Sequence, residues 1–253
     1  MDSIWGENSG TRCVVTLTFD IDGPSATLRR NPELADHPSD ISMGEFGPRV
    51  GTPRILDLLD RHGILATFFV PGWVAERNKE IVKYVADRGH EVAHHGYLHE
   101  PPSSLEPEES EGEILDLGSE ILESITGSRP KGYRSPSWEL SADSLRLLHE
   151  RGFTYDSSLM GDDIPYFVGD DSQRLVELPV HWALDDAPYY TYMPRRSYSS
   201  DGTAQRRSNG VAMGVRWGVP CEQGLYLDHA PAHVGSIRPA GSAGQVDIVH
   251  QAA

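Results

Sequence analysis

Two short stretches decide the fold of this chain: TFDID at residues 18–22 and EVAHHGYLH at residues 91–99. Each begins as a short apolar run, and each ends in side chains that can bind a metal ion. The first ends in Asp-x-Asp and the second contains His-x-x-x-His. Because the carboxyl ends of parallel strands lie at one edge of a sheet, we expect the two stretches to bring these groups together. That edge is the predicted functional site.

Length and charge limit the class of protein. The chain has 253 residues, enough for one large α/β domain with a hydrophobic core. Its formal net charge of −16 argues against binding to nucleic acid or to an anionic membrane surface, since both require a cationic surface. Cys13 and Cys221 provide no disulfide framework. We therefore predict no nucleic-acid or membrane partner; the charge says little about the substrate, and a homo-oligomer is compatible with the sequence.

The first eight residues, MDSIWGEN, are polar. They contain neither a basic segment nor the apolar segment of a secretory signal. No run of the chain approaches the roughly 18 apolar residues of a membrane span. The sequence therefore predicts a cytoplasmic protein.

Strand and helix patterns alternate along the chain, which predicts an α/β fold with a parallel sheet. Residues 23–50 are rich in Pro, Gly, Asp and Ser and predict a long loop beside the first strand end. Strands are expected at residues 13–19, 64–70, 91–94, 132–134, 153–156 and 175–180, and helices at residues 54–62, 79–88, 106–126 and 141–151.

The Asp-x-Asp pair allows two interpretations. In a regular strand Asp20 and Asp22 would point to the same face, so one carboxylate could bind a metal while the other acts as a base. Alternatively, residues 22–24 (Asp-Gly-Pro) form an ordinary turn whose acids are solvated. The pair alone favours neither interpretation.

The histidine pair shifts the balance toward a metal site. His95 and His99 have a separation that suits two imidazoles on one divalent ion. Gly96 replaces the Glu that a zincin helix would carry, so a strand-to-turn segment is expected. An isolated histidine is more often structural, and this interpretation applies to the others that we considered: His37, His62 and His149.

Together these groups predict a catalytic metal site. Asp22, His95 and His99 would leave coordination positions open for water and substrate. A metal there would lower the pKa of bound water and polarise a carbonyl oxygen. Asp20 could then accept the proton of the water.

The stretch at residues 134–138, RSPSW, follows another predicted strand. Arg134 could orient the base carboxylate through a charge-assisted hydrogen bond, and Trp138 could form a pocket wall. Considered alone, the segment is better explained by a surface arginine in a turn and a partly buried tryptophan.

Four motifs in order resemble those of the polysaccharide deacetylase (NodB-homology) family. They are TFDIDG at residues 18–23, HGYLH at 95–99, RSP at 134–136 and YDSS at 155–158. The resemblance extends over about residues 12–193, and the first two motifs together are specific.

The resemblance implies a deformed (β/α) barrel and the metal-dependent hydrolysis of an amide C–N bond other than a peptide bond. Carried over residue by residue, it makes Asp22, His95 and His99 the ligands of a divalent metal, usually zinc. It makes Asp20 the general base and Arg134 the residue that positions this base.

The resemblance also implies that Pro136 and Trp138 line the substrate groove. The forms of the first two motifs are more similar to a cytoplasmic branch of the family, which includes peptidoglycan-deacetylase-like proteins and relatives that act on cyclic imides or allantoin. N-acetylated sugars and small cyclic amides are therefore both expected substrates, and the segment 23–50 could close over a small one.

The C-terminal part departs from the family pattern. We divide the chain into an N-terminal extension (1–11), a catalytic domain (12–193) and an irregular segment (194–253). The family's last motif is a strand followed by a histidine in Met-His-Pro, which acts as general acid. The corresponding residues here, 226–233, contain His229 and His233 but not that motif.

A shifted reading frame would explain the departure. One permitted set of codons for residues 227–233, read from its second base, encodes Trp-Thr-Met-His-Pro-His, and continuing through residue 239 can give Thr-Ser-Gly-Arg. We hypothesise a frameshift near residue 195, which resequencing of the gene would test. The alternative to an enzyme is a non-catalytic metal- or glycan-binding relative that lacks the general acid.

Overall fold

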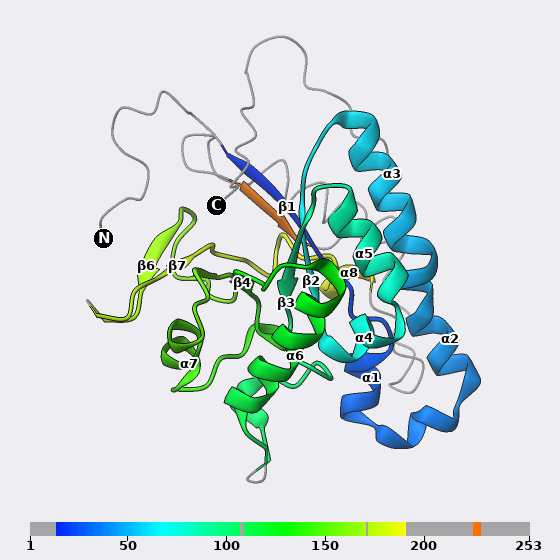
Figure 1. Cartoon of the computed structure of the whole chain (residues 1–253), viewed down its shortest axis with the longest axis horizontal. Coiled ribbons are helices and arrows are strands. Elements are labelled where there is room, and N and C mark those ends of the chain that lie inside the picture. The colour runs from blue at the N-terminus through cyan, green and yellow to red at the C-terminus, as the bar shows by residue number, and fades with distance from the viewer. Residues whose placement is uncertain (1–13, 107–108, 171, 191–224, 229–253) are drawn as a thin grey trace.

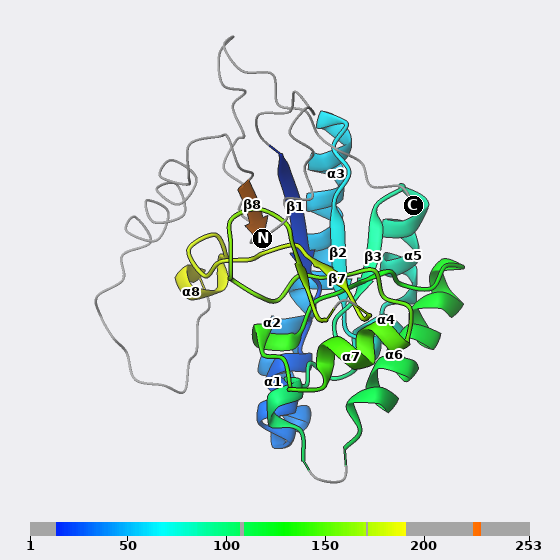
Figure 2. The ribbon, with the colours of Figure 1, turned by 90° about the vertical axis from the view of Figure 1, so that its left-hand side faces the viewer.

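The protein forms a curled, mostly parallel sheet with helices packed on its outer face (Figures 1 and 2). The computed structural model describes residues 14–106, 109–170, 172–190 and 225–228. Its strands are β1 (Val15–Asp20), β2 (Thr67–Val70), β3 (Glu91–His94), β4 (Gly132–Tyr133), β5 (Tyr155–Asp156), β6 (Tyr166–Val168), β7 (Leu175–Glu177) and β8 (Leu225–Asp228). Its α-helices are α1 (Ser25–Arg30), α2 (Pro38–Phe46), α3 (Thr52–His62), α4 (Gly72–Arg77), α5 (Lys79–Asp87), α6 (Glu111–Thr126), α7 (Ser144–Glu150) and α8 (Ala187–Tyr190).

The strand order is β6-β7-β5-β4-β3-β2-β1-β8. Every neighbouring pair is parallel except β6 with β7. In the described part of the chain β6 and β8 form the two edges, so the barrel is open there. The predicted α/β fold of the deformed (β/α) barrel type is confirmed.

The main core lies between the first strands and the helices that follow them. Phe19 of β1 and Phe68 of β2 stack with their ring centroids 5.1 Å apart. Helix α3 buries Ile55, Leu56 and Leu59 against this layer, at the spacing of one helical face. It ends at Gly63, whose φ of +62° is the left-handed conformation that glycine adopts at low cost, as predicted.

Helix α6 crosses the back of the strand that leads into the site. It begins after Ser110, whose side chain accepts a hydrogen bond from the Glu113 amide, five residues later than predicted. At Gly118 a β-carbon would lie 2.3 Å from Nε2 of His94, so the absence of a side chain permits this close approach to β3.

The prediction of a long loop at residues 23–50 is wrong. The segment contains α1, a 3-10 helix (Pro32–Asp36), α2 and a wide turn (Gly47–Gly51) that continues directly into α3. Pro32, Pro38 and Pro48 lie within the first two positions of their elements, where a missing N–H costs no hydrogen bond, and Pro24 is the residue directly before α1. Because α2 buries none of its residues, no periodic apolar face indicated a helix there.

Several elements were not predicted. They are the short helices α4 and α8, the antiparallel strand β6 and the strand β8. Strand β8 pairs with β1 in the register Val15↔Leu225 to Thr18↔Asp228. The proposed division at residues 11 and 193 stays a prediction. The N-terminal extension, and the segment 194–253 apart from β8, lie outside the described residues, as does the suspected frameshift.

Among the helices that the structure describes, none combines the length and apolar character needed to cross a membrane. The cytoplasmic location stays a prediction.

Candidate metal centre

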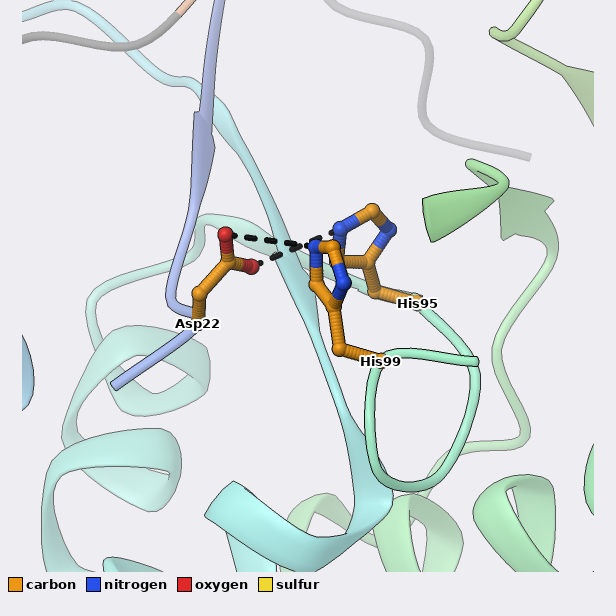
Figure 3. Close-up of side chains that lie close together, drawn as sticks. All are labelled: Asp22, His95 and His99. Carbon is orange, nitrogen blue, oxygen red and sulfur yellow. Dashed lines mark ion pairs between the residues drawn. The ribbon is translucent and has the colours of Figure 1, made fainter. Parts of the chain in front are cut away.

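Three groups that can bind a metal converge at the carboxyl ends of β1 and β3 (Figure 3). Asp22 lies just beyond β1, and His95 and His99 lie in the turn that follows β3. One potential ligand atom from each residue lies within 4.8 Å of the others. The sequence prediction that these two segments meet at one edge is therefore confirmed as a matter of geometry.

The spacing of these atoms fits a small divalent cation. Nε2 of His95 is 3.4 Å from Oδ1 of Asp22, and Nε2 of His99 is 3.4 Å from Oδ2 of Asp22. Ligands about 2.0–2.1 Å from a tetrahedral metal lie about 3.3 Å apart. Oδ1 of Asp22 is buried, and no described donor forms a hydrogen bond with it. A buried carboxylate oxygen in this position fits a metal ligand.

The ring of His95 is held in the orientation that a metal ligand needs. Its Nδ1 lies 2.8 Å from the carbonyl oxygen of Arg134. Since a carbonyl only accepts hydrogen bonds, Nδ1 must carry the proton, which leaves Nε2 of the neutral ring for a metal. The side chain is only 1% exposed, so packing also restricts its movement.

Asp20 and Arg134 form a buried ion pair beside these groups. Nη1 of Arg134 donates to Oδ1 of Asp20 at 2.9 Å, and the two side chains are 1% and 2% exposed. The second oxygen, Oδ2, lies 3.6 Å from Nε2 of His95. The arginine therefore fixes one oxygen of Asp20 while the other lies next to the candidate ligands.

The charges of the site influence one another strongly. Burial raises the pKa of Asp22, but His99 and His95 together outweigh this effect and hold the pKa well below its usual value. Burial lowers the pKa of His95, whereas Asp20 and Asp22 raise it by more, so its net shift is upward. Asp22 is thus ionised, and its negative charge makes the site attractive to a cation.

The sequence profile of the polysaccharide deacetylase family matches residues 7–155. The chain belongs to this family. A peptidoglycan deacetylase of Helicobacter pylori is 38% identical over 177 residues, which are 60% of this chain and 60% of the relative. A peptidoglycan deacetylase-like protein of Gibberella zeae is 33% identical over 209 residues, which are 72% of this chain and 62% of the relative. The matches thus span about three fifths of these curated relatives.

A solved structure agrees with the family and the fold. The crystal structure of a Mycobacterium smegmatis protein assigned to the polysaccharide deacetylases is 39% identical, with a TM-score of 0.76 over 90% of this chain and 79% of the other. The family resemblance inferred from the four motifs is confirmed.

The two predicted groove residues lie in a 3-10 helix (Pro136–Trp138) that follows β4. Pro136 packs on the metal-site turn, since its Cγ would lie 3.1 Å from a β-carbon at Gly96. Trp138 has a left-handed φ of +58° and stacks on Trp182, with ring centroids 4.1 Å apart. Trp182 was not singled out from the sequence, because only the fold brings it beside Trp138.

His94 is not among the converging ligand atoms, although it precedes His95 directly. The side chain is fully buried, and burial lowers its pKa to about 3. Its Nδ1 accepts a hydrogen bond from the Gly96 amide at 3.1 Å. His94 is therefore a neutral residue that shapes the turn.

A further residue of the turn was missed from the sequence. Glu100 is only 6% exposed, and its carboxylate accepts hydrogen bonds from the amides of Tyr97 (3.0 Å) and Leu98 (2.7 Å). These bonds close the turn in which His99 takes a left-handed φ of +61°. The only hint in the sequence was its place directly after the second histidine.

Replacement of Glu100 should weaken metal binding. In Glu100→Gln an amide group replaces one of the two acceptor oxygens, so the turn loses part of its support. We expect the metal affinity to fall about 10–100-fold, as for other residues that orient ligands. Competition with a chelator measures this. Glu76→Gln is the matched control, because Glu76 bonds the same turn through the Tyr97 hydroxyl (3.0 Å) at the surface and should leave the affinity unchanged.

Proposed function

We propose that this chain is a metal-dependent deacetylase, which hydrolyses the amide C–N bond of N-acetylated sugars. In this proposal Asp22, His95 and His99 hold a divalent metal, with zinc as the expected ion. The observation that carries it is the approach of these three groups to within 4.8 Å of one another, beside the ion-paired Asp20. Family membership and relatives named peptidoglycan deacetylase support it.

The protein residues would divide the chemistry among them. A bound zinc ion would supply Lewis-acid polarisation of the amide carbonyl and would lower the pKa of water. Asp20 acts as general base: Arg134 holds Oδ1 at 2.9 Å, and Oδ2 is directed toward the site to take the proton of the attacking water. Because Arg134 favours the ionised carboxylate, it keeps Asp20 ready to accept that proton.

Two further assignments belong to this proposal. Pro136 and Trp138 line the substrate groove, and the stacked pair of Trp138 and Trp182 offers an apolar wall for the face of a sugar ring. The general acid that protonates the departing amine would be His229 or His233. In the sequence His229 follows the last residue of β8 and His233 comes shortly after it. Both histidines lie outside the described residues.

An assay with a panel of substrates tests the proposal. We would measure acetate release from N-acetylglucosamine oligomers and peptidoglycan fragments, and ring opening of succinimide, hydantoin and allantoin, after chelation and again with added zinc. We expect acetate release that requires the metal. If only succinimide, hydantoin or allantoin were turned over, the substrates would be small cyclic amides and not N-acetylated sugars. Bound metal without any turnover would support the non-catalytic relative instead.

A further inference from the structure

Two buried carboxyl groups lie side by side behind the candidate site, and the chemistry above does not use them. Asp156 of β5 and Glu177 of β7 are cross-strand partners in the parallel register, and both are fully buried. Neither belongs to the converging metal-binding groups. Two adjacent anions in the interior would be strongly destabilising, so their protonation state needs an explanation.

One oxygen of each carboxyl group has well-defined partners. Oε1 of Glu177 accepts hydrogen bonds from the amides of Ser158 (3.0 Å) and Leu159 (2.9 Å). Oδ1 of Asp156 accepts a hydrogen bond from the Ser158 hydroxyl at 2.7 Å. The pair therefore anchors the backbone and side chain of the segment 157–159 that follows β5.

The second oxygens, Oδ2 of Asp156 and Oε2 of Glu177, are also buried, and no described donor bonds to them. As carboxylates both can only accept, and they would repel each other. A single proton on one of them supplies the missing donor and removes one charge. Burial, together with the neighbouring Asp156 charge, raises the pKa of Glu177 well above its usual value. Burial raises the pKa of Asp156 less, since Arg134 is among the groups that oppose the shift.

The same segment holds the arginine of the site. Nε of Arg134 donates to the carbonyl oxygen of Ser157 (3.0 Å), and its Nη2 donates to the Ser157 hydroxyl (2.9 Å). The hydroxyl of Ser158 accepts from the Ser135 amide at 2.8 Å. Ser158, which bonds both carboxyl groups, is joined through the backbone to Ser157. Ser157 bonds Arg134, which in turn bonds Asp20.

We propose that Asp156 and Glu177 share one proton, carried by Glu177, and that this acid pair positions Arg134 and thereby the base Asp20. The positioning part rests on the proposed function, since it assumes that Asp20 is the base. In this arrangement Glu177 donates its O–H to the Asp156 carboxylate, and both residues are positioning residues that do not touch the substrate.

The surrounding titratable groups agree with this assignment. Arg134 is the positive charge that faces the pair from the end of β4, and it favours an ionised Asp156. Tyr133 of β4 and Tyr166 of β6 also face it, and burial raises the pKa of both phenols, so they remain neutral. The remaining contacts with the pair come from the uncharged residues at 157–159.

The shared proton has a consequence for stability. Because the pKa of Glu177 is higher in the folded than in the unfolded state, the folded protein holds a proton that the unfolded chain releases. This contribution is complete below the usual pKa of a glutamate and is lost as the pH rises through the folded value. Glu177→Gln keeps a donor to Asp156 but cannot titrate. This variant should therefore not lose stability in this way as the pH rises.

Three variants test the proposal: Glu177→Gln, Glu177→Leu and Asp156→Asn/Glu177→Gln. We expect the wild type to lose stability relative to Glu177→Gln as the pH rises from about 5 to about 9, measured by urea unfolding. Glu177→Leu, which has neither donor nor acceptor, should lose about tenfold or more in kcat with unchanged KM and metal content, and Glu177→Gln should recover most of it. The double variant should be less stable than Glu177→Gln alone, since the NH₂ group of asparagine then replaces one of the two acceptor oxygens of Asp156.

Two spectroscopic measurements do not depend on turnover. The infrared band of a protonated carboxyl group should be present in the wild type and absent in Glu177→Gln. The NMR signal of the Arg134 Nε–H should shift in Glu177→Leu. Parallel pH dependence of the wild type and Glu177→Gln, without that band, would overturn the shared proton. An unmoved arginine signal would overturn the positioning role. If no substrate is turned over, the proposed function fails while these results still decide the inference.

Discussion

Asp20→Asn is expected to lower kcat by about 10²–10⁴-fold, the usual contribution of a general base, while the protein still binds its metal. The change is nearly isosteric, and the amide oxygen of asparagine can still accept the hydrogen bond that Arg134 now gives to Oδ1 at 2.9 Å. The second position, however, becomes an NH₂ group that cannot take a proton from water. Steady-state kinetics together with metal analysis measure both effects.

Asp22→Asn is the matched control for this experiment, because it makes the same chemical change two residues away. Asp22 is one of the three converging ligand residues, so this variant should lose metal affinity as well as activity. The two variants should therefore separate into one that binds metal without turnover and one that binds it poorly. Equal metal loss in both would show that Asp20 is itself a ligand, and full activity of Asp20→Asn would exclude it as the base.

The features that the sequence predicted well are local ones. Residues 18–22 and 91–99 carry both the apolar pattern of a strand and the ligands that follow it, so the strand ends and the candidate ligands could be located together. Helices α3 and α5 were found because each buries one face at helical spacing. Since parallel strands present their carboxyl ends at a common edge, the convergence of these groups also followed from the pattern.

The features that the sequence did not predict either lack a periodic apolar face or depend on how the folded chain surrounds a residue. Helix α2 has no buried residue, so its pattern resembled that of a loop. Glu100 and Glu177 look like ordinary surface acids in the sequence, and only the turn and the strand pairing bury them. Acids are rarely buried without a partner. The partners here are the turn amides for Glu100 and the neighbouring strand residue Asp156 for Glu177, and the sequence pattern identified neither.

Arg134→Leu is expected to cause the largest loss of stability, about 3–5 kcal/mol, because it leaves a buried charge without its partner. The Arg134 side chain is 1% exposed, and its guanidinium group bonds Asp20, Thr18 and Ser157 and lies 4.1 Å from the centre of the Phe69 ring. Leucine fills part of this space but satisfies none of the acceptors. Urea unfolding at neutral pH of the metal-free protein measures the change in the free energy of unfolding.

The double variant Asp20→Asn/Arg134→Leu separates the lost ion pair from the lost packing. Asparagine removes the buried negative charge, so the double variant should regain part of the stability that Arg134→Leu loses. Arg134→Lys keeps a positive charge, but its ammonium group lacks the planar fork that bonds Ser157 and Asp20 at the same time. Its free energy of unfolding should therefore lie between those of the wild type and Arg134→Leu. If Arg134→Leu cost less than about 1 kcal/mol, as an exposed pair would, the arginine would not be holding a buried carboxylate in place. A large loss that the asparagine does not relieve would instead assign the stabilisation to the contacts with Phe69 and Ser157.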